Sequence, residues 1–186
     1  MSSGAVGAFA NVPLSVPAWR ARSIGFQVGL ICAAVALPHL AHVTGAPVLW
    51  LLPMHWPVIV AGLVYGPVAG LVAGVLSPMA SFTLSGMPPM PSLAMMTVEL
   101  GLYGLLTGLL RARLRWNAVL AVAIALLAGR IVAIMMGLAI GRPLPLLAST
   151  YAKGLICAVA QVATLPTVAR WWVGRQSGGR SAAGMD

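Results

Sequence analysis

Residues 53–110 read PMHWPVIVAGLVYGPVAGLVAGVLSPMASFTLSGMPPMPSLAMMTVELGLYGLLTGLL. The stretch is almost wholly apolar, is interrupted by proline and glycine, and is far longer than the roughly 20 residues of one membrane-spanning helix. It contains one histidine, His55, and one acidic residue, Glu99. An ionisable side chain inside such a segment is costly, so both residues are candidates for a functional site. The stretch therefore predicts several membrane spans around a polar site.

The composition of the whole chain supports a polytopic membrane protein. Hydrophobic residues make up 60% of the 186 residues and charged residues 7%. The net charge of +9 does not indicate nucleic-acid binding, because the basic residues are scattered at the ends of apolar segments without an aromatic and basic surface. Cys32 and Cys157 lie in apolar runs and have no metal or redox spacing. We predict an all-α fold, a compact bundle of transmembrane helices.

The apolar segments and the turn signals between them predict six spans: residues 24–43, 49–65, 68–84, 92–110, 118–140 and 144–173. Pro53 and Pro57 predict an irregular start for the second span. The first run lacks the pattern of a cleaved signal peptide, so we expect it to be retained. The expected organisation is a short N-terminal segment (1–19), a membrane domain (20–173) and a polar cytoplasmic tail (174–186).

The basic residues that lie at the ends of the spans or between them predict the orientation. With six spans, one side of the membrane holds both termini together with Arg20, Arg22, Arg111, Arg113, Arg115, Arg170, Arg175 and Arg180. The opposite side holds Arg142. Positive charges gather on the cytoplasmic side of membrane proteins, so we predict that both termini are cytoplasmic and that the protein is a multi-pass protein of the cell membrane.

The ionisable residues within the spans map to the outer half of the membrane. Glu99, Arg130 and Lys153 lie roughly seven to ten residues from the outer ends of their spans, or about 10–15 Å deep. His55 lies near the start of the second span and His42 at the outer end of the first. We predict a polar pocket open to the outside, with these five residues as candidate substrate-binding residues.

Each candidate also has a structural interpretation. Glu99 can form a buried ion pair with Arg130 or Lys153, and this role is compatible with ligand contact. Lys153 can instead extend towards the membrane surface. His42 and His55, with His39, could form a metal site, but no cysteine or second carboxylate converges with them. We therefore predict no metal ligands.

Gly25, Gly29 and Ala33 recur every four residues in the first span. Such spacing leaves a smooth face that another helix can approach closely, either within this chain or on a separate subunit. The chain has no phosphate-binding loop and no catalytic arrangement of serine, histidine or carboxylates. We therefore predict that it is not an enzyme and binds no cofactor, so that an ATP-driven process would need another polypeptide.

The chain resembles the substrate-binding S components of energy-coupling factor (ECF) vitamin transporters over about residues 24–173. The similarity lies in residues 36–110, in AGRIVAIMMGLA (128–139) and in KGLICAVAQVATLPTVA (153–169), with LPMHWPV and GMPPMP…MTVELGLYG as its most specific parts. This resemblance implies six helices, a vitamin pocket near the outer face, and association with a transmembrane coupling protein and two ABC-type ATPases. It also implies docking through the first helix, where Gly25, Gly29 and Ala33 match a motif that usually has alanine.

We therefore predict a membrane-embedded substrate-binding subunit of an ATP-driven importer of a vitamin or related micronutrient. The alternative is a stand-alone secondary transporter or channel for a small solute or metal ion. Six spans without a convincing inverted repeat, and with one carboxylate to carry a coupling proton, disfavour that alternative. The net positive charge of the expected pocket favours a ligand with a carboxylate or phosphate, but the sequence does not name the vitamin.

Overall fold

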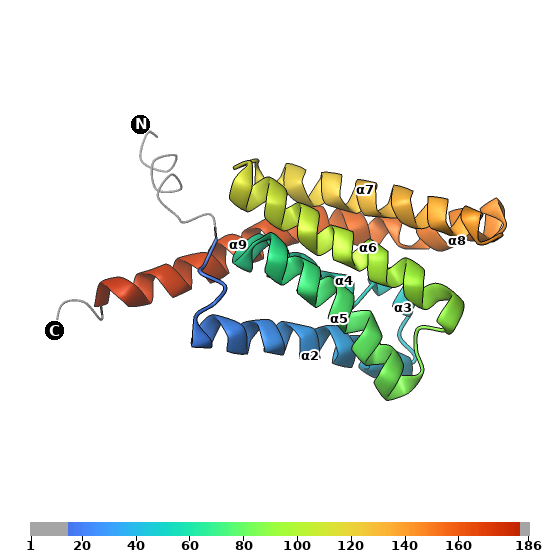
Figure 1. Cartoon of the computed structure of the whole chain (residues 1–186), viewed down its shortest axis with the longest axis horizontal. Coiled ribbons are helices and arrows are strands. Elements are labelled where there is room, and N and C mark those ends of the chain that lie inside the picture. The colour runs from blue at the N-terminus through green and yellow to red at the C-terminus, as the bar shows by residue number, and fades with distance from the viewer. Residues whose placement is uncertain (1–14, 183–186) are drawn as a thin grey trace.

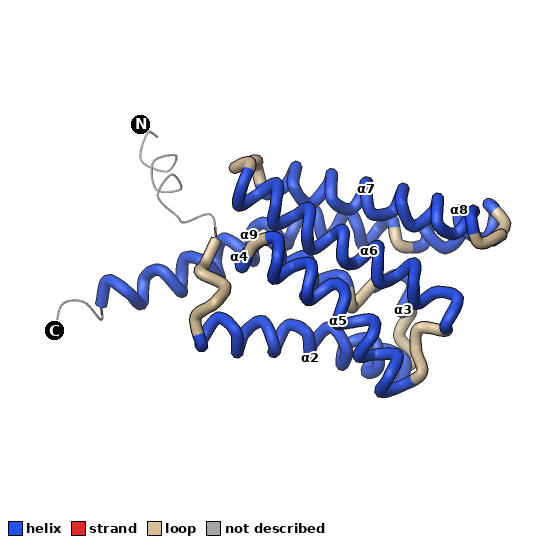
Figure 2. The backbone as a smooth tube through the Cα atoms, in the orientation of Figure 1, coloured by secondary structure: helices blue, strands red, loops and turns tan. Residues whose placement is uncertain are grey.

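The computed structural model describes residues 15–182, and all regular elements in this part of the chain are helices (Figures 1 and 2). In chain order these are α2 (Ala21–Val43), α3 (Val48–Leu51), α4 (His55–Tyr65), α5 (Pro67–Ser85), α6 (Met90–Gly108), the π-helical turn η1 (Leu109–Arg113), α7 (Ala118–Ala139), α8 (Leu144–Lys153) and α9 (Leu155–Ala182). The predicted all-α bundle is confirmed.

The long helices account for five of the predicted spans. α2, α5, α6 with η1, α7 and α9 are each long and apolar enough to cross a membrane. α4 is apolar but has 11 residues, which is short for a crossing. The short helix α3 precedes it, and Leu52 between them has the left-handed conformation, with φ 44°. The predicted irregular start of the second span is thus confirmed, as a break between α3 and α4.

The predicted sixth span, residues 144–173, is wrong as a single helix. Gly154 separates α8 from α9, and Arg130 of α7 donates hydrogen bonds to the carbonyl oxygens of Tyr151 and Gly154 at this break. A side chain at Gly154 would press on Leu52 and on Arg130. The break therefore rests on a tertiary contact that hydropathy does not register. α9 also continues beyond the predicted end at Val173, so the first part of the polar tail is helical.

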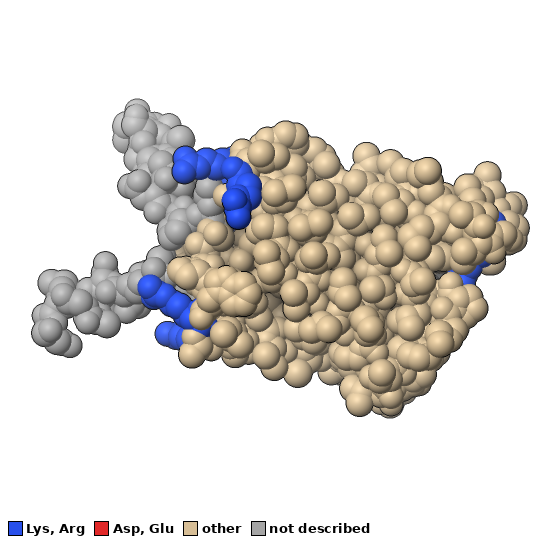
Figure 3. Space-filling model, viewed as in Figure 1, with Lys and Arg blue, Asp and Glu red and all other residues tan. Residues whose placement is uncertain are grey.

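The two ends of the bundle differ in charge. The start of α2, the α6–α7 connection and the end of α9 lie at one end, whereas α3, the α5–α6 connection and the α7–α8 connection lie at the other (Figure 1). On the face shown in Figure 3, most lysine and arginine atoms gather at the first end. We call it the basic end, and it includes Arg20 before α2 and Arg111 and Arg113 in η1. Because the start of α2 and the end of α9 share this end, the chain crosses the bundle an even number of times, as predicted from the sequence.

The tightest packing lies between α4, α5 and α6, along a line of glycines that we call the glycine seam: Gly62, Gly70, Gly74, Gly104 and Gly108. A methyl group added at Gly104 would collide with the backbone of Gly70, so only glycine permits this approach. All residues of α4 except Trp56 are buried. The seam fixes the position of α6, which carries Glu99.

Candidate functional site

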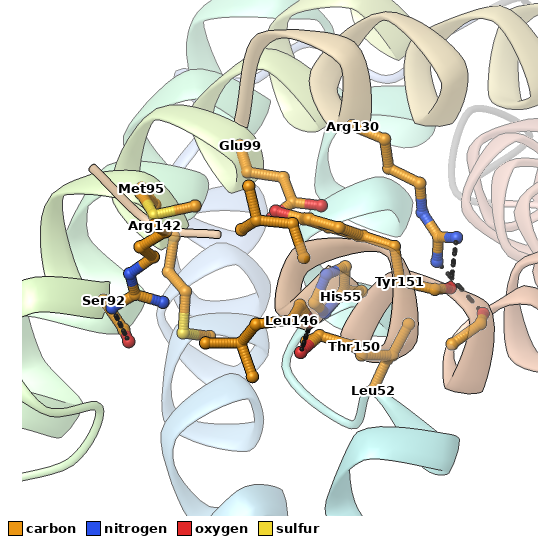
Figure 4. Close-up of a pocket in the computed structure, with 13 residues that line it drawn as sticks. Leu52, His55, Ser92, Met95, Glu99, Arg130, Arg142, Leu146, Thr150 and Tyr151 are labelled. Atoms are coloured by element: carbon orange, nitrogen blue, oxygen red, sulfur yellow. Dashed lines mark hydrogen bonds between the residues drawn. The ribbon is translucent and has the colours of Figure 1, made fainter. Parts of the chain in front are cut away.

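A cavity of about 180 Å³ lies between α6, α7, α8 and the turn before α4 (Figure 4). Its charged and polar lining residues are His55, Ser92, Glu99, Arg130, Arg142, Thr150 and Tyr151, and the remainder are Leu, Met and Gly. The cavity lies towards the end of the bundle opposite to the basic end. α8 and the α7–α8 connection are found at that opposite end. The structure thus brings together polar side chains from segments that are up to about 100 positions apart in sequence.

Glu99 is the acidic residue of this cavity and is 5% exposed. Its carboxylate accepts hydrogen bonds from the Tyr103 hydroxyl at 2.5 Å and from the Tyr151 hydroxyl at 3.3 Å. Tyr103 lies one turn further along α6, whereas Tyr151 belongs to α8. The buried carboxylate is therefore satisfied by two hydroxyl groups and links α6 to α8.

Arg130 approaches the same group from α7. Its guanidinium donates to the carbonyl oxygens of Tyr151, at 3.2 Å, and Gly154, at 3.0 Å, which lie at the end of α8. Its Nε is buried and has no hydrogen-bond partner in the described part of the chain. Within those residues no ion pair joins Arg130 or Lys153 to Glu99; Tyr151 bridges Arg130 and Glu99 instead, through its carbonyl and its hydroxyl.

His55 begins α4 and is 5% exposed. Its ring centre lies 5.3 Å from that of Tyr103, and its Nδ1 is a buried atom without a hydrogen-bond partner among the described residues. His55 also lines a second, more apolar cavity of about 390 Å³, which extends towards α2 and the α5–α6 connection. The two cavities share Leu52, His55, Ser92 and Met96, so His55 stands between them.

The sequence-predicted site residues are thus distributed unevenly. Glu99, Arg130 and His55 line the first cavity. His42 lies on the second cavity, together with His39 and His55. Lys153, the last residue of α8, is exposed and lines neither cavity. Among the described residues no cluster of histidine, cysteine and acidic side chains has the arrangement of a metal site.

Four charged or polar residues of the cavity were not among the predicted site residues: Ser92, Arg142, Thr150 and Tyr151. Arg142 was interpreted from sequence as a marker of topology, yet it lines the cavity and donates to the Ser92 hydroxyl at 3.0 Å. Tyr151 lay unremarked in the predicted sixth span, although a tyrosine buried in an apolar segment needs a partner for its hydroxyl. The need for such a partner could have marked Tyr151 as a candidate site residue. The sequence does not identify the partner, because Glu99 lies 52 positions away.

The small residues of the first helix lie outside the cavity. Gly25 and Gly29 are exposed on α2, and a methyl group added at either would meet no atom within 4 Å among the described residues. Ala33 is half-buried. Packing among the described residues therefore does not require glycine at position 25 or 29. The docking role of this face stays a prediction.

Comparison with protein families matches residues 24–174 to the family described as "ECF transporter, substrate-specific component". The match begins within α2 and ends within α9, so it includes the lining of both cavities. Comparisons with curated proteins and with solved structures give no match.

Proposed function

The chain belongs to the family of substrate-specific components of ECF transporters, and we propose that it captures a vitamin or related micronutrient for an ATP-driven importer. It is a multi-pass protein of the cytoplasmic membrane and a substrate-binding subunit rather than an enzyme. The observation that carries the proposal is the cavity between α6, α7 and the short helix α8, which Glu99, Arg130 and Arg142 all line. With the basic end in the cytoplasm, this cavity faces the outer side.

The charges of the cavity favour a substrate with an anionic group. Two arginines line it against one carboxylate, and the two tyrosines already satisfy that carboxylate. Within the described part of the chain Arg142 donates one side-chain hydrogen bond, to Ser92, so several of its N–H groups are available for a carboxylate or phosphate. The planar guanidinium of arginine can donate two parallel hydrogen bonds to such an anion, and this pairing is strong and directional.

The second cavity extends this substrate description. It adjoins the first at His55 and Met96 and is lined mainly by proline, methionine and other apolar side chains. Polarisable methionine side chains accommodate apolar bodies of varied shape. We propose a substrate whose anionic group lies near Arg142 and Arg130, and whose apolar part extends past His55 towards His42. Of the substrate-binding residues predicted from sequence, Glu99, His55, Arg130 and His42 line these two cavities and Lys153 lines neither; we add Arg142 to the first four.

The energy for transport comes from other chains in this proposal. The sequence holds no nucleotide-binding motif, so ATP is bound by two ABC-type ATPases that act through a transmembrane coupling protein. The exposed Gly25 and Gly29, with Ala33, form the face of α2 on which the coupling protein docks.

The test of this function is identification of the substrate followed by uptake. Mass spectrometry of small molecules that co-purify with the full chain identifies candidates, and uptake of a radiolabelled candidate is measured in cells with and without the coupling module. We expect uptake that needs the module and hydrolysable ATP. Equal uptake by cells that express this chain alone would contradict the proposal and support a secondary transporter.

The docking face has its own test. Gly29→Leu fills the smooth face of α2, so we expect loss of co-purification with the coupling protein and loss of uptake, while the isolated subunit still binds substrate. Val28→Leu, one position away on the exposed side of α2, is the matched control. Complex formation by Gly29→Leu at the wild-type level would remove this face from the interface.

A further inference from the structure

A second polar feature lies at the basic end, far from the substrate cavity. Here a hollow of about 230 Å³ separates α2 from α9, and Arg22, Phe26, Trp171, Trp172 and Arg175 line it. The two arginines come from opposite ends of the chain, and only the bundle brings them to one hollow. Neither the substrate cavity nor the proposed transport function uses these residues.

The aromatic residues hold the arginines in place. The guanidinium carbon of Arg175 lies 4.3 Å from the ring centre of Trp171, and that of Arg22 lies 5.8 Å from the ring centre of Phe26. Cation–π contact of this kind occupies the face of a guanidinium and leaves its N–H groups at the edge free to donate. The contacts thus orient two positive groups without neutralising them.

The base of the hollow is fixed by packing and one hydrogen bond. Phe26 and Trp172 contact edge to face, with ring centres 5.2 Å apart, and the indole N–H of Trp172 donates to the Tyr65 hydroxyl at 3.1 Å. Both aromatic residues pack against the hydrophobic core. The hollow is therefore anchored to the bundle through α4 and is more than a chance approach of two surface side chains.

The positive charge of the hollow has no counter-charge in the described part of the chain. Glu99 is the one acidic residue there, and it belongs to the substrate cavity away from the basic end. Arg22 and Arg175 are both exposed. Tryptophan and arginine are typical of the membrane–water boundary, where lipid phosphate groups lie.

We propose that this hollow binds the phosphate group of an anionic phospholipid from the leaflet at the basic end, which is the cytoplasmic leaflet in the orientation given above. The phosphate accepts hydrogen bonds from Arg22 and Arg175 together, and the rings of Phe26 and Trp171 contact the glycerol and upper acyl carbons. Because Arg22 precedes Gly25 by three positions and Gly29 by seven, the lipid lies beside the cytoplasmic end of the proposed docking face.

The test compares lipid retention by purified full-length chains. Wild type and the Arg22→Gln/Arg175→Gln double variant are taken up in mixed micelles of phosphatidylglycerol and phosphatidylcholine, and native mass spectrometry measures the ratio of the two lipids bound. A basic residue in contact with the anionic headgroup contributes a preference of roughly fivefold, and this attraction decreases with distance from the charge, so we expect the double variant to lose roughly 25-fold in this ratio. Arg111→Gln/Arg113→Gln removes equal charge at the same end, outside the hollow, and keeps most of the preference.

Three outcomes would overturn the proposal. The first is equal loss in both double variants, which would mean diffuse attraction without a site. The second is displacement of the bound lipid by millimolar inorganic phosphate, which would mean a site for a soluble anion. The third is unchanged lipid retention combined with loss of the coupling-protein complex in Arg22→Gln/Arg175→Gln, which would make the hollow part of the protein interface. Unchanged thermal stability of the variants shows that the comparison reports on binding.

Discussion

The two halves of the bundle are held together in different ways. Towards the basic end, the glycine seam brings the backbones of α4, α5 and α6 into direct contact, and α4 is buried almost throughout. At the opposite end, Leu147 is the buried residue of α8, which is otherwise attached through polar groups such as Tyr151. One half is a rigid scaffold built from backbone contact, and the other is a separate segment over a polar cavity.

This difference suits a binding protein. Each hydrogen bond that attaches α8 contributes about 1 kcal/mol, whereas disturbance of close backbone packing costs several times more. We infer that α8 can move away from the cavity while the glycine seam stays intact. Glu99 lies where the two halves meet, because it belongs to a seam helix and accepts a hydrogen bond from α8. The predictions below test this division, first through global stability, then through substrate affinity and last through the local opening of α8.

Gly104→Ala should cause the largest loss of stability. Its methyl group would overlap the backbone of Gly70, and neither helix can give way without separating α5 from α6. We expect the free energy of unfolding to fall by about 3 kcal/mol, measured by chemical denaturation in detergent micelles. Gly25→Ala, on an exposed helix face, is the control and should be neutral or stabilise by up to about 1 kcal/mol. Equal effects at both positions would contradict the rigid seam.

Arg130→Ala should weaken substrate binding strongly. It removes a guanidinium beside the proposed position of the substrate's anionic group and leaves the carbonyl oxygens of Tyr151 and Gly154 without this donor. We therefore expect a loss of about 2–5 kcal/mol, or roughly 30- to several thousand-fold in affinity. Titration of the co-purified substrate, by calorimetry on folded protein, measures it.

Two further variants show whether the effect of Arg130→Ala arises from lost contact with the substrate. Arg142→Ala removes the other arginine proposed to bind the substrate's anionic group and leaves the α8–α9 break unchanged. We expect substrate affinity to fall in this variant too. Lys153→Ala tests the sequence prediction, since Lys153 is exposed and lines neither cavity, and the structure favours a small effect. Unchanged affinity in both arginine variants would move the anion site elsewhere.

Tyr151→Phe should have the smallest effect on stability, and the effect should be confined to α8. It removes the 3.3 Å hydrogen bond between α8 and Glu99, a contact we expect to contribute about 1 kcal/mol. Hydrogen exchange followed by mass spectrometry should show faster exchange in α8 and unchanged exchange in α4 and α5. Tyr103→Phe, which removes the other hydroxyl from Glu99 inside the seam, should instead lower global stability. Faster exchange throughout the bundle in Tyr151→Phe would contradict an independent α8.

Much of the architecture could be predicted because it depends on local properties. Apolar length, turn residues and the distribution of arginine predicted five of the spans and the placement of the start of α2 and the end of α9 at the same end of the bundle. The second span was correctly expected to start irregularly, since Pro53 and Pro57 act within their own segment. The sixth span was mispredicted only as one continuous helix from residue 144, because its break at Gly154 is held by Arg130, 24 positions earlier in the sequence.

The sequence by itself determined the membrane class, the helical fold, the charge difference between the two ends and the family, because hydropathy and motif spacing are properties of neighbouring residues. The tertiary structure decided which polar groups meet. It placed Tyr151 between Glu99 and Arg130, brought Arg142 to the cavity and left Lys153 on the surface. The physical reason is that a buried carboxylate or guanidinium is satisfied by whichever donors and acceptors the packed helices bring close, and close glycine packing sets those positions.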